Sequence, residues 1–134
     1  MEAYRFNKTK TTPHISFDPA TGIFEIKGES RPENVRTFFE PILLWIEDFF
    51  NHVKTNGINN INPIILTIQL GYFNSSSAKF IFDYILKMKH IKELGLSVTI
   101  IWVHDEGDDD MKLAGMDLSE MIEINFEFQE VRGK

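Results

Sequence analysis

The chain has 134 residues and a formal net charge of -6, and 43% of its residues are hydrophobic. This length and composition indicate one domain with its own hydrophobic core. The negative charge argues against nucleic acid or an anionic membrane as the main partner, because both favour basic surfaces. The absence of cysteine excludes disulfides, cysteine–zinc sites and thiol catalysis, and it fits a cytoplasmic protein. No segment resembles a signal peptide or a membrane span, since the longest apolar run covers only residues 41–46.

The N-terminal quarter has the pattern of a leader followed by a β-hairpin. Residues 1–12 are mostly polar, and we expect either a mobile leader or a short edge strand there. Residues 14–17 and 23–27 alternate apolar and polar side chains on either side of the turn-forming residues 18–22. This pattern predicts a hairpin with one solvent-facing side.

A helix is expected after the hairpin. Ser30 and Glu33 form an S-x-x-E capping box, and Pro32 suits the first helical turn. Pro41 would cost about 3 kcal/mol inside an unbroken helix, so we expect a kink or two helices in series. Apolar side chains recur every three or four residues and predict a stripe that packs on a sheet: Phe38, Phe39, Ile42, Leu43, Ile46, Phe49, Phe50 and Val53.

The chain is organised around residues 64–80. Residues 64–70 are apolar and β-branched, which predicts an interior strand covered on both faces. Gly71 can adopt a backbone conformation closed to other residues, and the run from Asn74 to Ser77 supplies helix-capping side chains. The junction therefore presents hydroxyl groups at the positive end of a helix, where a phosphate is favoured. Helix capping alone also accounts for such a run, and this alternative stays open.

Further elements are expected toward the C-terminus. Residues 78–94 have the spacing of a helix, and residues 97–103 that of a buried strand. An acidic loop at 104–110 is followed by a short helical segment at 111–115 and a last strand at 122–128. The predicted order is β-β-α-β-α-β-α-β, a single-domain α/β fold with a mixed sheet formed by the hairpin and parallel strands.

Three predicted loops follow the carboxyl ends of strands, at residues 29–34, 72–77 and 104–110. Open α/β sheets place their functional sites at this edge. We therefore expect the three loops to gather into one site.

The acidic loop has several interpretations. Asp108, Asp109 and Asp110 are typical of a solvated, mobile loop. The spacing does not fit a calcium-binding EF-hand, because no glycine stands at the sixth position from Asp105 or Asp108. Weak Mg²⁺ binding and docking to a basic patch on a kinase or partner are the sharper alternatives, and we prefer docking.

Four segments resemble the SiaC family of bacterial regulatory phosphoproteins. They are residues 28–34, 39–46, 72–79 and 109–115, and they include the patterns G-x-S-x-P-E-N and Y-x-N-[ST]-S-S-x-K. The resemblance spans nearly the whole chain. It implies one domain over residues 1–134 with an α/β fold similar to STAS-type anti-sigma factor antagonists.

The resemblance also implies a partner-switching function. In the family, a kinase phosphorylates the hydroxyl residue directly after the asparagine, and a PP2C-type phosphatase removes the phosphate. The unphosphorylated protein binds and activates an output protein, a diguanylate cyclase in the best-known system. The matching residue is Ser75, where the family member used for comparison has threonine, and Ser76 is the second choice. We expect no catalytic residue, no cofactor and no metal.

The expected surface for the partner and the phosphate surrounds Ser75. A phosphate adds about -1.5 to -2 charges, which helix N–H groups, Lys79 and Arg31 are placed to hold and which the acidic loop would repel. We hypothesise that this charge makes it unfavourable for a partner to cover the surface. Its expected residues are Glu29, Arg31, Tyr72, Asn74, Ser76, Ser77, Lys79, His104, Asp105, Asp109 and Asp110.

Two other functions are compatible with these residues. A STAS-like binding scaffold that is never phosphorylated would differ only in the state of Ser75. A small hydrolase would combine Ser75, His104 and an aspartate from the acidic loop, but no G-x-S-x-G elbow surrounds the serine. The other histidines show no metal-ligand spacing. The sequence therefore favours a regulatory protein over an enzyme.

Overall fold

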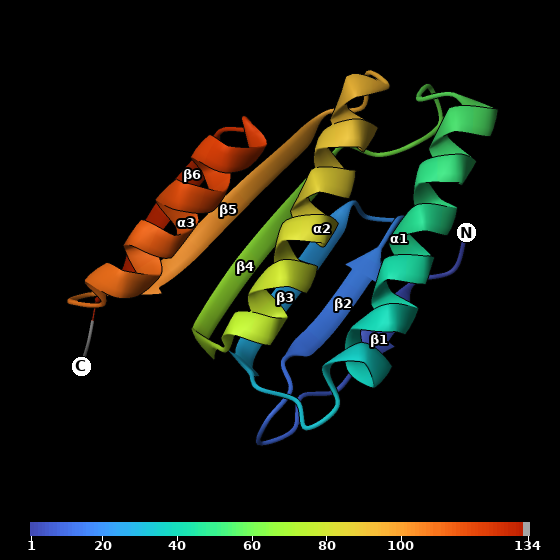
Figure 1. The fold of residues 1–134 in the computed structure, drawn as a ribbon. Helices are drawn as coiled ribbons and strands as arrows, with labels where there is room; N and C mark the ends of the chain where they lie inside the picture. The colour runs from blue at the N-terminus through green and yellow to red at the C-terminus, as the bar shows by residue number, and fades with distance from the viewer. Residues whose placement is uncertain (133–134) are drawn as a thin grey trace.

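The structure is a computed structural model that describes residues 1–132. These residues form a six-stranded sheet and three helices (Figure 1). The elements in chain order are β1 (Tyr4–Phe6), β2 (His14–Asp18), β3 (Ile23–Ser30), α1 (Val35–Asn56), β4 (Ile64–Phe73), α2 (Ser75–Glu93), β5 (Val98–Asp105), α3 (Asp109–Ile122) and β6 (Phe126–Val131). None of these helices is long and apolar enough to cross a membrane.

The strands lie in the sheet in the order in which they occur in the chain. β1, β2 and β3 pair antiparallel, and β3 to β6 pair parallel, so the predicted mixed sheet and hairpin are confirmed. Residues 4–6 form the short edge strand that was one of the two expectations for the N-terminus. Each helix connects two neighbouring parallel strands, and all three helices lie on the same face of the sheet (Figure 1).

The opposite face of the sheet carries no helix in the described chain. Along β4, Ile64, Leu66 and Ile68 are buried, whereas Ile65 between them is 47% exposed. The prediction of an interior strand is confirmed, because β4 lies between β3 and β5, but the prediction that both of its faces are covered is wrong. The reason is topological, because connections between adjacent parallel strands all cross on one side when they share one hand.

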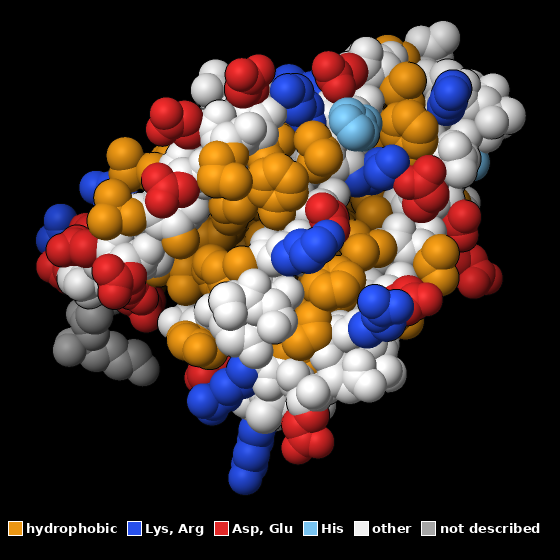
Figure 2. All heavy atoms as spheres, viewed as in Figure 1, with side chains coloured by type: hydrophobic (Ala, Val, Ile, Leu, Met, Phe, Trp, Pro, Cys, Tyr) orange, Lys and Arg blue, Asp and Glu red, His pale blue; other side chains and the backbone are white. Residues whose placement is uncertain are grey.

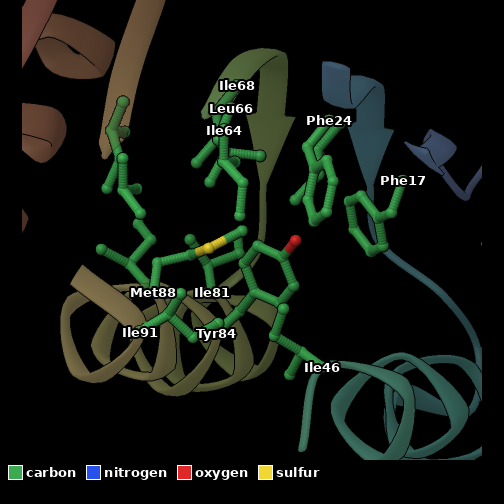
Figure 3. Packing of buried hydrophobic residues seen from close by; sticks show 14 of the residues in the cluster. Phe17, Phe24, Ile46, Ile64, Leu66, Ile68, Ile81, Tyr84, Met88 and Ile91 are labelled. Atoms are coloured by element: carbon green, nitrogen blue, oxygen red, sulfur yellow. The ribbon is translucent and has the colours of Figure 1, made fainter. Parts of the chain in front are cut away.

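The core between the sheet and the helices is rich in aromatic rings (Figure 3). Phe17 from β2 stacks on Phe24 from β3 at 5.3 Å and on Tyr84 from α2 at 5.0 Å between ring centroids. Trp45 from α1 covers both phenylalanines. The hydroxyl oxygen of Tyr84 is buried without a hydrogen-bond partner. Complete burial of each such ring contributes roughly 2 kcal/mol of stability, so this cluster ties β2, β3, α1 and α2 together.

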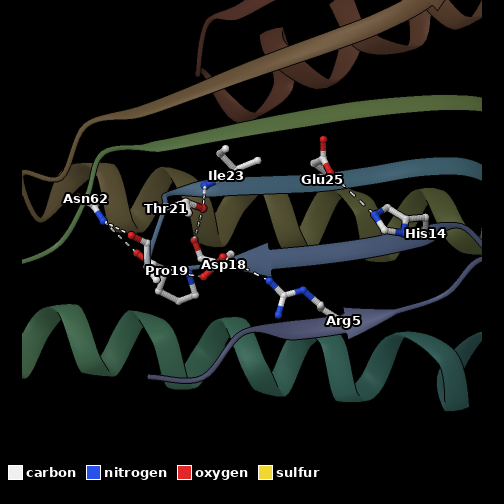
Figure 4. A network of polar contacts seen from close by, with 9 residues as sticks. Arg5, His14, Asp18, Pro19, Thr21, Ile23, Glu25 and Asn62 are labelled. Atoms are coloured by element: carbon white, nitrogen blue, oxygen red, sulfur yellow. Dashed lines mark hydrogen bonds and ion pairs between the residues drawn. The ribbon is translucent and has the colours of Figure 1, made fainter.

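The turn between β2 and β3 is held by polar contacts (Figure 4). The carboxylate of Asp18 accepts from the backbone N–H of Ala20 and pairs with Arg5 on β1 at 3.3 Å. Asn62, in the loop before β4, donates to the carbonyl oxygen of Ala20 at 2.6 Å. Gly22 has a φ of 78°, and an added Cβ would lie 2.0 Å from the backbone oxygen of Pro63. The predicted turn is confirmed, and it also fixes the start of β4.

The first helix begins later than the sequence predicts. The N-cap is Asn34, whose side chain accepts from the backbone N–H of Thr37 at 3.0 Å. The predicted capping box and the placement of Pro32 in the first turn are wrong, because Ser30 ends β3 instead. The helix also continues through Pro41, so two helices in series are not formed. Pro41 is exposed, and the carbonyl that loses its partner there can therefore bond to water.

The last helix is longer than predicted, and the last strand begins later. α3 continues past Gly115 to Ile122, and β6 begins only at Phe126. Gly115 does not end the helix but lies against the Trp102 ring, where an added Cβ would be 2.5 Å from the ring atoms Cδ1 and Nε1. Ile122 belongs to the buried stripe of α3 and not to a strand. Helical and strand spacings coincide over such short apolar runs, which explains the error.

Candidate functional site

The junction between β4 and α2 lies at the carboxyl edge of the sheet, as predicted. β4 continues through Gly71 as extended backbone without a positive φ, so the special conformation expected at this glycine is not used. Asn74 caps α2 by accepting from the backbone N–H of Ser77 at 2.8 Å. Ser75 is the first residue of the helix, and both Ser75 and Ser76 are exposed.

Ser77 differs from the two serines before it because it is completely buried. Its hydroxyl donates to the carbonyl oxygen of Ser30 at 3.2 Å and accepts from the Ser30 hydroxyl at 2.9 Å. The backbone N–H of Asn74 donates to the same carbonyl at 3.0 Å. These bonds join the end of β3 to the start of α2. Ser77 is thus part of the core and does not lie on the surface expected to meet a partner.

A groove of about 640 Å³ lies beside Ser75, between the N-terminal parts of α1 and α2. Two of its lining residues carry a positive charge, Arg36 from α1 and Lys79 from α2. The full lining is Val35, Arg36, Glu40, Leu43, Ser75, Ser76, Lys79 and Phe80. The groove therefore combines the two exposed hydroxyls with cationic side chains from both helices.

Sequence reasoning missed Arg36. Arg36, Glu40 and Leu43 follow the i, i+4, i+7 spacing of one helix face, which is the signal that could have found them. This spacing is the same whether the helix begins after Ser30, as predicted, or after Asn34, as observed.

The two cations expected to hold a phosphate lie in different places. Lys79 lines the Ser75 groove and pairs with Asp83 one turn further along α2 at 3.1 Å. Arg31 pairs with Glu29 at 3.7 Å and lines a separate hollow with Lys8 and other residues of the N-terminal segment. Glu29 itself belongs to β3 and not to a loop. The structure therefore places Lys79, but not Arg31, in the groove beside Ser75.

The third predicted loop is mostly regular structure. His104 and Asp105 are the last residues of β5, and His104 is buried, with Nδ1 3.2 Å from the carbonyl oxygen of Asp105. Asp105 lines a hollow together with Glu29 and Gly71, which brings the ends of β3, β4 and β5 together.

The expected mobile acidic loop is instead the start of α3. Asp108 caps the helix by accepting from the backbone N–H of Met111 at 3.1 Å, and Asp109 and Asp110 form its first turn. Carboxylates at this end stabilise the helix through its dipole, which is the physical reason for the order. Residues 1–132 contain no cluster of three or more His, Asp or Glu side chains placed to hold a metal ion.

Another hollow lies between α2 and α3. Its lining is largely apolar and includes Phe73, Phe82, Leu118 and Met121, and Figure 2 shows hydrophobic side chains gathered between these helices. The ring of Phe73 at the end of β4 packs edge-on against Trp102.

Tyr72, next to Phe73 in the chain, is 47% exposed at the end of the same strand. The predicted surface residue Tyr72 is thus accessible.

The described residues do not support a serine hydrolase. No hydrogen bond joins Ser75 to His104 within residues 1–132, and His104 is held below the surface at the end of β5. The Asp108 carboxylate serves as a helix cap. The three residue types therefore do not assemble into a nucleophile, base and orienting acid.

Comparisons with known proteins agree with this architecture. A sequence profile described as "SiaC family regulatory phosphoprotein" matches residues 6–131. This chain belongs to the SiaC family. An uncharacterized protein of Pseudomonas aeruginosa (strain UCBPP-PA14) is 28% identical over 101 residues, which cover 75% of each chain.

Solved SiaC structures have the same fold. SiaC of Pseudomonas aeruginosa is similar over 99% of this chain and 100% of its own, with a TM-score of 0.78 and 25% identity. A chain in the crystal structure of the diguanylate cyclase SiaD in complex with its activator SiaC, from the same organism, gives a TM-score of 0.79 and 25% identity over 97% of this chain and 99% of that chain. The predicted family and the predicted single-domain α/β fold are therefore confirmed.

Proposed function

We propose that this protein is a cytoplasmic partner-switching regulator controlled by reversible phosphorylation of Ser75. A cognate Ser/Thr kinase transfers the phosphoryl group: the Ser75 hydroxyl oxygen bonds to the γ-phosphorus of ATP, the bond to ADP breaks, and the hydroxyl proton passes to a base of the kinase. A PP2C-type phosphatase hydrolyses the phosphoserine and releases inorganic phosphate. The unphosphorylated protein binds and activates an output protein such as a diguanylate cyclase.

The observation that carries this proposal is the position of Ser75. It is the exposed first residue of α2 and directly follows the capping Asn74. The first turn of α2 contains no acidic residue, so the partial positive charge of the helix end is available to a phosphate. Ser76 is also exposed and remains the second choice, whereas Ser77 is buried.

The output protein is expected to cover the surface around Ser75 and Tyr72. Both side chains are exposed at the carboxyl edge of the sheet, where α/β proteins bind their partners. A phosphate on Ser75 places about -1.5 to -2 charges there, which a covering partner would have to desolvate. The activation of the cyclase SiaD by SiaC is the precedent for an output protein of this class.

Phosphopeptide mapping tests the proposal. The protein and its Ser75→Ala and Ser76→Ala variants are incubated with ATP and a lysate of their own host, and intact masses are measured. We expect one phosphate on wild type and on Ser76→Ala, mapped to Ser75, and none on Ser75→Ala. Phosphate on Ser76 alone would show that the modified residue is Ser76 and not Ser75. No phosphate on any form, while a control substrate is modified, would leave a binding scaffold that is never phosphorylated.

A further inference from the structure

The groove beside Ser75 contains an arginine without an ion-pair partner in the described chain. Arg36 lines this groove from α1, and no Asp or Glu oxygen of residues 1–132 lies within 4.0 Å of its guanidinium nitrogens. Glu40 lines the same groove one turn further along but does not pair with it. The guanidinium of Arg36 lies in the same groove as the exposed hydroxyls of Ser75 and Ser76. It is therefore available to a new anion.

The second cation of the groove comes from the opposite wall. Lys79 is on α2 and pairs with Asp83 through an exposed contact. Such exposed pairs contribute little to stability, so the ammonium group can turn toward a stronger acceptor at small cost. The groove also contains one carboxylate, Glu40, so the side chains that line it carry a net charge of about +1.

We propose that the phosphate carried by Ser75 is bound within the same chain by Arg36, with Lys79 as the second cation. This inference rests on the proposed phosphorylation of Ser75. A phosphate accepts two parallel hydrogen bonds from the planar guanidinium group, a geometry that lysine does not offer. Because Arg36 lies on α1 and Ser75 on α2, the modified residue ties the two helices together at their N-terminal ends.

This contact changes how the switch acts. The phosphate occupies the part of the groove beside Ser75 and takes up the cations that a partner's carboxylate would otherwise meet there. Phosphorylation therefore blocks the surface by occupying it, in addition to adding charge. The half-buried apolar side chains of Val35, Leu43 and Phe80 line the same groove.

The test uses protein with phosphoserine installed at position 75 during translation, so that no kinase is needed. Wild type, Arg36→Gln and Arg31→Gln are compared with and without the phosphate. Arg31→Gln is the matched control, because it removes the same charge from the separate hollow near Glu29. Thermal unfolding gives the melting temperature, and phosphorus NMR follows the second ionisation of the phosphate.

We expect the phosphate to raise the melting temperature of wild type and Arg31→Gln by about 3 °C, and that of Arg36→Gln by less than half as much. The pKa of the phosphate should be lower in wild type than in Arg36→Gln, because a neighbouring cation favours the dianion. Equal behaviour of the Arg36 and Arg31 variants would overturn the contact. Because the phosphate is installed directly, this outcome is distinct from a failure of the host kinase to modify Ser75.

Discussion

The N-terminal ends of α2 and α3 are capped by the same kind of hydrogen bond but carry different charges. Each helix follows the carboxyl end of a parallel strand, and each is capped by a side chain that accepts from the backbone N–H three residues further on, Asn74 in α2 and Asp108 in α3. The first turn of α2 then exposes Ser75 and contains no acid. The first turn of α3 contains Asp109 and Asp110.

The two helix ends differ in how their partial positive charge is compensated. At α3 the carboxylates already compensate the partial positive charge of the helix, and the indole N–H of Trp102 donates to the backbone oxygen of Met111 to fix the first turn. At α2 the first turn exposes the hydroxyl groups of Ser75 and Ser76 and contains no carboxylate. The proposed phosphorylation of Ser75 would add at α2 the negative charge that Asp109 and Asp110 supply at α3.

The largest effect is expected where α3 lies against the sheet. Gly115→Ala places a Cβ 2.5 Å from ring atoms of Trp102, and we expect a loss of about 3 kcal/mol in the free energy of unfolding because the buried indole has no room to move. Urea denaturation measures it. Gly71→Ala is the control, since its Cβ would meet nothing closer than 3.9 Å, and its change should stay within about 0.5 kcal/mol. Equal losses for both would show that α3 is not fixed by this contact.

The pH dependence of stability at Tyr84 tests how firmly the middle of α2 is packed against the sheet, for comparison with α3. Burial raises its pKa well above the usual value of 10.0, so the folded protein keeps the phenol proton where the unfolded chain releases it. Stability should therefore fall above pH 10, by up to about 1.4 kcal/mol per pH unit.

The Tyr84→Phe variant removes this alkaline loss. It should also gain roughly 1 kcal/mol at neutral pH, because the deleted hydroxyl has no hydrogen-bond partner. Tyr72→Phe, at an exposed tyrosine, is the control and should change the free energy of unfolding at neutral pH by no more than about 0.5 kcal/mol. If Tyr84→Phe loses as much unfolding free energy above pH 10 as wild type does, the Tyr84 hydroxyl must reach solvent.

Removing the two caps sharpens the comparison itself. Asn74→Ala and Asp108→Ala should each cost about 1 kcal/mol, since each leaves a backbone N–H without its acceptor. The cost at Asp108 should shrink at high salt, because part of it is electrostatic, whereas the cost at Asn74 should not. Urea denaturation at two salt concentrations separates them. The same salt dependence at both caps would contradict the difference in charge.

The smallest effects have opposite signs. Ser75→Asp places an acid in the first turn of α2 and should stabilise the protein by about 0.5 kcal/mol, whereas Asp109→Asn should destabilise it by a similar amount. Thermal unfolding at low salt measures both. A destabilising Ser75→Asp would show that the positive end of α2 is not available to an anion.

The order of elements could be predicted because periodic apolar spacing and turn residues are local signals. The β2–β3 hairpin, the stripe of α1 and the junction after β4 all follow from such signals. The length of α3 could not be predicted in this way. A glycine such as Gly115 is typical of a helix end. Its role inside α3 is visible only in the structure, where it lies against the ring of Trp102 on β5.

The sequence predicted the position of the candidate site better than it predicted which side chains lie together there. Ser75 follows Asn74 at a predicted strand–helix junction, and the structure confirms its exposure, while its modification stays a prediction. The spacing along α1 groups Arg36 with Glu40 and Leu43, but it could not place them beside Ser75, because that depends on how α1 and α2 pack. The sequence patterns favoured Arg31 as a cation for the phosphate. In the structure Arg31 forms an ion pair with Glu29 and lines a different hollow.

The most direct test of the switch is the affinity of the two forms for an output protein. Binding of the diguanylate cyclase from the same host is measured by calorimetry with unmodified protein, with Ser75→Ala and with phosphoserine installed at position 75. We expect the first two to bind alike and the phosphorylated form to bind at least about tenfold more weakly, because the partner would have to cover a charged group. Equal affinity of the phosphorylated and unmodified forms would contradict the assignment of Ser75 as the switch.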